Sequence, residues 1–181
     1  MATPPTFSSG AVLTAAQMNS VGLWLVKTQT VGTAVSSVTV TGAFSADYQN
    51  YLILMSGGTQ TDNTSIYVQL GASATGYYAF LNYGDVTAGT PLGANRNNGV
   101  RFAWVGGGKA TFASHASFQL INPFGAVYTK LLNGTYQNDG GYGMTIGEHR
   151  VATSYTSFVL GPESGTLTGG TIYVYGYKGT V

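Results

Sequence analysis

The sequence predicts an all-β fold: a jelly-roll-like antiparallel β-sandwich that follows a short N-terminal arm. From residue 31 onward, apolar and polar residues alternate with a period of two, as they do in strands that bury one face. Clusters of Gly, Asn and Asp separate these runs, and no segment between them has the length and periodicity of a crossover helix. Short strands without crossover helices pair antiparallel, which favours a sandwich.

The expected division is an arm at 1–30 and one sandwich domain at 31–181, because 181 residues fit a single domain of ordinary size. Strands are expected at 35–42, 48–56, 64–71, 76–83, 99–105, 113–122, 127–137, 142–151, 155–161 and 170–178. In the last of these, Ile172, Val174 and Gly176 point one way and Tyr173, Tyr175 and Tyr177 the other. Three tyrosines are too much aromatic surface to leave bare, so either a neighbouring loop or a second subunit covers them.

Turn signals separate the strands. We interpret Gly57-Gly58 and Asn97-Asn98-Gly99 as turns, and Gly106-Gly107-Gly108 as a flexible glycine connection. The triple glycine is followed by Lys109-Ala110, and the missing Ser or Thr after the lysine argues against a phosphate-binding loop. Asp139-Gly140-Gly141 is the clearest hairpin signal, because Asp-Gly suits the positive φ of a primed turn.

The arm differs from the rest of the chain. Two prolines favour an extended start, and the segment 13–19 is the one stretch that favours a helical turn or two, ending near Gly22. A helix this short is not stable alone, so we expect the arm to become ordered by docking on a partner or a sister subunit. The residues expected to make this contact are Pro4, Pro5, Phe7, Leu13, Met18 and Trp24.

Composition excludes several classes of function. Charged residues make up 7% of the chain, and a net charge of +1 gives no electrostatic footprint for nucleic acid. No run approaches the roughly 20 apolar residues that a membrane helix needs, so no membrane insertion is expected, and the first residues do not form a secretory signal. Net charge near zero favours association, so we expect an oligomer or a component of an assembly.

A search for chemistry finds no catalytic constellation, so we expect no enzyme and no cofactor. The carboxylates of Asp47, Asp62, Asp85 and Asp139 lie beside turn residues. Glu148 and Arg150 share one side of a strand, which favours a surface ion pair or an interface contact. His149 lies on the opposite side and is expected to be an ordinary strand residue. With no cysteine and two separated histidines, we expect no transition-metal site. Asp and Asn side chains leave a calcium site open, although Asp62-Asn63 lacks the alternating spacing of a calcium loop.

Aromatic residues are the remaining candidates for function. Rigid aromatic rings suit interfaces and also stack on sugar faces. The candidates for glycan contact are Tyr77, Tyr78, Tyr83, Trp104 and Tyr142, and the candidates for a subunit interface are Tyr173, Tyr175 and Tyr177. For most aromatic residues, burial in the core or cover for the sheet remains the simpler interpretation.

Three segments resemble proteins of tailed bacteriophages. Residues 7–19 are similar to an F-x-x-G-x-x-L-T-A-A-x-x-N start found in phage tail, fibre and appendage proteins. Residues 44–53 are similar to an F-s-x-x-Y-x-x-Y-x-I segment of small virion proteins, and residues 155–176 resemble their C-terminal strand pair closing on Tyr-Gly. The resemblance implies a virion protein, made in the host cytoplasm, with a jelly-roll-like domain that is often trimeric, and it supplies no catalytic residues.

Three hypotheses follow. The first is a structural virion subunit of a fibre, tail tip or head decoration, held by its N-terminal arm and in contact with other virion proteins, with a homotrimer favoured. The second is a receptor- or glycan-binding module that contacts the host surface. The third, a depolymerising enzyme, is disfavoured because no pair of carboxylates stands out.

Overall fold

The computed structural model describes residues 10, 12 and 22–177, and these residues form β-strands with no helix among them. The strands are β1 (Trp24–Thr30), β2 (Val38–Val40), β3 (Asn50–Ser56), β4 (Thr59–Gln60), β5 (Thr64–Leu70), β6 (Tyr77–Asp85), β7 (Pro91–Gly99), β8 (Phe102–Lys109), β9 (Phe112–Ile121), β10 (Thr129–Asn138), β11 (Gly141–His149), β12 (Phe158–Pro162), β13 (Leu167–Thr168) and β14 (Thr171–Tyr177). The predicted all-β sandwich is confirmed. No helix in the described part of the chain has the length and apolar character to cross a membrane.

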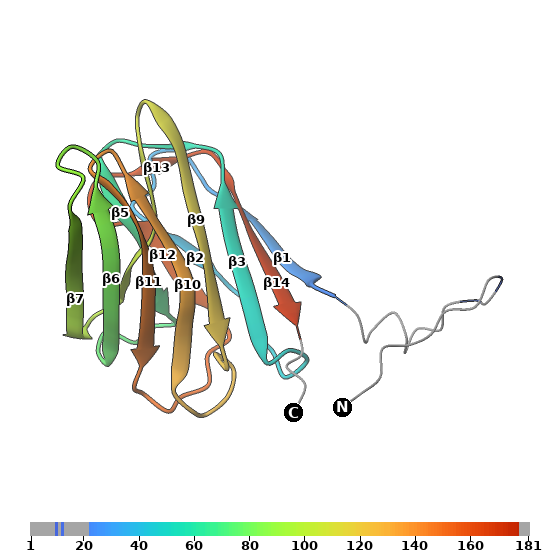
Figure 1. Cartoon of the computed structure of the whole chain (residues 1–181). Helices are drawn as coiled ribbons and strands as arrows, with labels where there is room; N and C mark the ends of the chain where they lie inside the picture. Colours follow the sequence, from blue (N-terminus) through green and yellow to red (C-terminus); the bar gives the residue numbers. More distant parts are fainter. Residues whose placement is uncertain (1–9, 11, 13–21, 178–181) are drawn as a thin grey trace.

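Two antiparallel layers make up the sandwich. The larger layer has eight strands in the order β1-β14-β3-β9-β10-β11-β6-β7, which lie side by side in Figure 1. The smaller layer behind it has the order β2-β12-β5-β8, and the short pair β4 and β13 lies at one end. Within the larger layer, β9, β10 and β11 are neighbours in sequence and in space, whereas β3 and β14 bring distant segments together.

The two layers are joined at β9. Leu120 of β9 pairs with Tyr51 of β3 on one side and with Leu131 of β10 on the other. Nearer the start of β9, Ala116 still pairs with Met55 of β3 on one side, but on the other side it pairs with Gly106 of β8 and not with a residue of β10. The same edge of β9 therefore pairs with β10 at one end and with β8 at the other. The two layers diverge at this branch point of β9, which we name the fork.

The three glycines of β8 make this fork sterically feasible. A Cβ on Gly106 would lie 2.1 Å from the backbone oxygen of His115, and a Cβ on Gly107 would lie 1.7 Å from the backbone oxygen of Gln137. Gly108 is equally crowded, by Ser114 of β9. The interpretation of this run as a flexible connection is wrong: the glycines form a buried strand because only a residue without a side chain fits between β9 and β10.

The core lies between the layers and is built from the inward residues of both. In β14, Ile172, Val174 and Gly176 are buried while the tyrosines face outward, as the alternation predicts. Large aromatic side chains fill the centre, including Tyr51, Phe102, Phe118 and Phe158. The inward residues of β9 (Ala116, Phe118 and Leu120) are those that the sequence predicts.

The short strands β4 and β13 and two longer strands, β1 and β7, lie outside the expected ranges. β7 contains Pro, Gly and three Asn residues, which disfavour a strand, and part of it falls on the expected turn at 97–99. It is the edge strand beside β6. β1 falls within the expected arm, but it pairs along its length with β14 and is part of the larger sheet.

Turn predictions had mixed outcomes. Asp139 and Gly140 connect β10 to β11, with Asn138 paired to Gly141, so the hairpin is confirmed. The primed turn is not, because neither connecting residue has a positive φ. Gly57 and Gly58 have φ values of 78° and 74°, a left-handed conformation that suits glycine, which confirms that turn. The helical turn expected at 13–19 lies outside the described residues and has no structural support.

Candidate functional site

The larger sheet has one face on the core and one face directed away from it, which we name the outer face. Successive cross-strand partners follow one row from β14 to β6: Tyr177, Asn50, Ile121, Lys130, Glu148 and Tyr78. Directly paired residues of an antiparallel sheet project to the same side. The tyrosines of β14 and the outward residues of β6, β10 and β11 therefore share a single face.

An apolar strip crosses this face on β6, β10 and β11. It consists of Phe80, Leu132, Tyr142, Met144 and Ile146, of which Phe80 is 52%, Tyr142 55%, Met144 56% and Ile146 55% exposed. Large apolar side chains with more than half of their surface in water are individually ordinary, but a contiguous group marks an interaction surface.

The strip exists because β11 has an inverted pattern. Its large apolar residues point outward, while Gly143, Thr145 and Gly147 point inward. A Cβ on Gly143 would lie 2.3 Å from the backbone oxygen of Asn82, and one on Gly147 would lie 2.6 Å from that of Tyr78. At these two positions the inner side of β11 has no room for a side chain, so the apolar residues cannot exchange faces by a slip of register.

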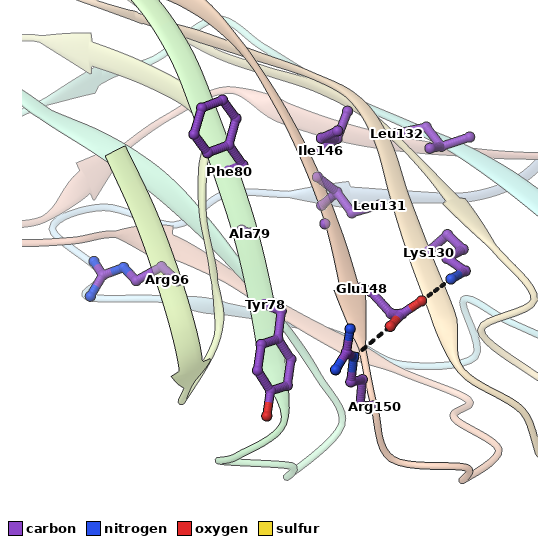
Figure 2. A pocket seen from close by; sticks show the side chains of 11 residues that line it. Tyr78, Ala79, Phe80, Arg96, Lys130, Leu131, Leu132, Ile146, Glu148 and Arg150 are labelled. Carbon is purple, nitrogen blue, oxygen red and sulfur yellow. Dashed lines mark hydrogen bonds and ion pairs between the residues drawn. The ribbon is translucent and has the colours of Figure 1, made fainter. Parts of the chain in front are cut away.

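A charged corner of three residues borders the strip (Figure 2). Glu148 of β11 lies between Lys130 of β10 and Arg150, and its Oε1 accepts a hydrogen bond of 2.6 Å from Arg150 Nε. The Arg150 guanidinium also lies 4.6 Å from the centre of the Tyr78 ring. The predicted ion pair of Glu148 and Arg150 is confirmed, and Lys130 extends it into a triad.

Two shallow hollows lie along the strip, each with a volume of about 410 Å³. The first is bounded by Tyr78, Phe80, Ile146 and the charged corner, as Figure 2 shows. The second contains Asn82, Pro91, Tyr142 and Met144. Both combine an apolar floor with a few polar groups, which suits contact with another molecule.

The tyrosines of β14 mark the opposite side of the outer face. Tyr173, Tyr175 and Tyr177 are half-buried, and the rings of Tyr173 and Tyr175 are stacked with centroids 6.5 Å apart. Tyr177 donates a hydrogen bond of 3.3 Å to the side-chain oxygen of Gln119. Leu52 and Leu54 of β3 pair with Tyr175 and Tyr173, and these half-buried leucines continue the apolar surface toward the middle of the sheet.

The structure separates the five residues expected to contact glycan. Tyr78 and Tyr142 lie on the outer face. Tyr77 is fully buried: its hydroxyl accepts a hydrogen bond of 2.8 Å from Leu70 N and donates one to the Ser73 carbonyl, and burial strongly raises its pKa. The assignment of Tyr77 as a glycan contact is therefore wrong.

Trp104 and Tyr83 also lie away from the outer face. Trp104 is half-buried against the core with the Arg96 guanidinium 5.3 Å from its ring centre. Tyr83 is half-buried and makes an edge-to-face contact with Tyr136. The alternation in the sequence predicts strands at these aromatic residues, but it does not show which side of each strand faces the other sheet.

The residues expected to dock the arm are only partly described. Trp24 is the first residue of β1 and pairs with Gly176 of β14, so it belongs to the sheet. Pro4, Pro5, Phe7, Leu13 and Met18 lie outside the described residues.

The six carboxylates all have partners that hold the fold together. Asp85 accepts hydrogen bonds from the backbone N–H groups of Thr87 and Ala88, as expected of a turn residue. Glu163 accepts hydrogen bonds from Arg101 at 2.8 Å and from Arg96 at 3.5 Å. The remaining pairs are Asp47 with Ser45, Asp62 with Ser164, Asp139 with Lys109, and Glu148 with Lys130 and Arg150.

The two histidines occupy different environments. His149 is fully buried, with Nε2 3.0 Å from the Ser73 hydroxyl and its ring 4.1 Å from the Tyr77 ring. His115 faces outward on β9 and is half-buried. Burial lowers the pKa of both side chains, because each loses hydration that favours its charged form. His149 is thus buried in the core, on the side of its strand opposite Glu148, as the alternation predicts.

No group of three or more His, Cys, Asp or Glu residues that could hold a metal ion occurs within residues 22–177 or at the two described positions before them. Comparison of the chain with protein-family models, with curated proteins and with solved structures found no match.

Proposed function

We propose that this chain is a structural subunit of a tailed-bacteriophage virion: a fibre, tail-tip or head-decoration protein that displays the β-sandwich and is held by its N-terminal segment. The observation that carries the proposal is the outer face, where the apolar strip and the tyrosines of β14 extend over one side of the larger sheet. A soluble subunit exposes such a surface when another protein covers it in the assembly.

Two further observations support a structural role. Each carboxylate of the chain is engaged with a cation, a hydroxyl or a turn amide, in the pattern that stabilises a scaffold. The net charge of the chain, +1, is close to zero, which favours association. The similarity of residues 7–19, 44–53 and 155–176 to phage virion segments supplies the kind of assembly.

Immunogold labelling of purified phage particles, with antibody raised against this chain, tests the proposal. The expected result is gold at one defined place, on the tail tip, the fibres or the head, together with peptides of this chain in mass spectra of the same particles. Particles that carry neither gold nor peptides would overturn the virion assignment.

A second candidate function, glycan binding at the host surface, has one specific observation in its favour. Tyr142 is exposed beside the hollow that also contains Asn82 and Pro91, so an aromatic ring and an amide are available to one ligand. Stacking on a sugar ring and hydrogen bonding to its hydroxyls use these groups. The test is saturable binding on a glycan array that Tyr142→Ala abolishes and that Tyr128→Ala, a change at another exposed tyrosine, leaves intact.

A further inference from the structure

We propose that two copies of this chain pair through their outer faces, with a two-fold axis that runs parallel to the strands between β9 and β10. The inference rests on the proposed function, which takes the outer face as a surface that another protein covers. It identifies that protein as a second copy of the chain. It assigns no position in the particle, so the pairing is testable on the purified protein.

The outer face has the area that a stable pair requires. Eight strands at a spacing of about 4.8 Å span about 34 Å. Strands of 7 to 10 residues are about 23 to 33 Å long at about 3.3 Å per residue. The product, roughly 800 to 1,100 Å², equals or exceeds the 800 Å² or so that each partner contributes to a standard interface.

The two halves of the face are complementary, row by row. A two-fold axis between β9 and β10 places β14 opposite β6 and β3 opposite β11 of the second copy, and it preserves position along the strands. The row that contains Tyr177 then lies against the same row of the second copy, with Tyr177 of one copy opposite Tyr78 of the other. One row further along, Tyr175 lies opposite Phe80.

The β3 half of the face is matched in the same way. Leu52 lies in the row of Tyr175 and meets Ile146. Leu54 and Met144 each lie two residues further along their strands, beyond the last β9–β10 pair, and the same axis places them opposite each other. The half-buried leucines of β3 thus cover the most exposed residues of β11. Sheets that pack face to face keep their strands nearly aligned, as this axis requires.

Charge is compatible with self-pairing. The charged corner contains Lys130, Glu148 and Arg150, and the Glu148 carboxylate lies between the two cations and neutralises part of their charge. The axis places Glu148 opposite Asn50 and Lys130 opposite Ile121 of the second copy. Each charged side chain of this row therefore lies directly opposite an uncharged one.

Two measurements on the full chain test the pairing. Light scattering coupled to gel filtration is expected to give twice the 18.8 kDa of one chain. Ile146→Lys, which places a charge within the interface, is expected to give a monomer. Thr39→Lys, at the exposed position of β2 in the other sheet, is expected to leave the dimer intact. Circular dichroism of each variant identifies any loss of fold.

Cross-linking tests the axis itself, and the absence of native cysteine makes each introduced thiol unique. Leu52→Cys and Ile146→Cys chains, mixed and treated with a short bismaleimide, are expected to cross-link. Either variant alone is expected to react poorly, because its two thiols lie three strand spacings, about 14 Å, apart in addition to the gap between the sheets.

A monomeric or trimeric mass, a dimer that resists Ile146→Lys, or cross-linking of either variant alone as strong as that of the mixture would overturn the pairing. None of these results affects gold labelling of the particles, and an unlabelled particle does not affect the mass of the pure protein. The two proposals therefore fail separately.

Discussion

Gly107→Ala tests the description of the fork between the two sheets. The new methyl group would lie 1.7 Å from the backbone oxygen of Gln137, half the separation of an ordinary van der Waals contact, which begins at 3.4 Å. Backbone atoms of β10 cannot rotate away as a flexible side chain does, so β8 and β10 must separate. Overpacking of a core by a single methyl group costs about 1–3 kcal/mol and occasionally more. We expect a loss in the free energy of unfolding at the upper end, about 3 kcal/mol.

The assay is urea unfolding at neutral pH, followed by tryptophan fluorescence and circular dichroism, with Gly84→Ala as the matched control. Gly84 lies within strand β6, as Gly107 lies within strand β8, and a methyl group added there would enter open space, with no neighbouring atom within 4 Å. Its substitution is expected to change the free energy of unfolding by less than about 0.5 kcal/mol. Equal effects of the two substitutions would refute the steric account of the triple glycine.

Three other changes have defined outcomes. Tyr77→Phe removes the acceptor of the buried Leu70 N–H and is expected to lose about 1–3 kcal/mol in urea unfolding; a loss below about 0.5 kcal/mol would contradict this role. Lowering the pH from about 7.5 to 5 is expected to destabilise the fold, since burial lowers the pKa of His115 and His149 and the unfolded chain takes up protons first, near its ordinary pKa of about 6.5. The loss begins as pH falls through that value and levels off below the folded-state pKa, and a flat stability profile would count against it. Glu163→Gln, which weakens the contacts to Arg96 and Arg101, is expected to cost about 1 kcal/mol in urea and less in high salt, because the side chain is partly exposed; a loss unchanged by salt would argue against an electrostatic cause.

The period-two alternation was sufficient to predict most of the strands and the inward residues of β9 and β14. It failed at β7, where Asn and Pro favour a turn, because pairing with β6 supplies what local propensity lacks. It also failed at the triple glycine, since the need for glycine there comes from Gln137, a residue far away in sequence. Local patterns do not report such contacts.

The outer face shows the same limit. The tyrosines of β14 could be recognised from sequence because apolar residues on the other side identify the core. In β11 the pattern is reversed, with glycines inward and Met144 and Ile146 outward. The sequence of β11 does alternate glycine with large apolar residues. Which of the two sets faces the core depends on how closely β11 approaches Asn82 and Tyr78 of β6. Only the three-dimensional packing reveals which side is the core.

The fork at β9 has a consequence for how the molecule comes apart. A strand that hydrogen-bonds to β3, β8 and β10 ties both layers to one element, so neither layer can dissociate while the other keeps its ladder. Unfolding should then proceed as one all-or-none transition, with equal calorimetric and van't Hoff enthalpies. Backbone amides of β9 should exchange their hydrogens only when the whole molecule opens, whereas those of the edge strand β7 should exchange through local fraying.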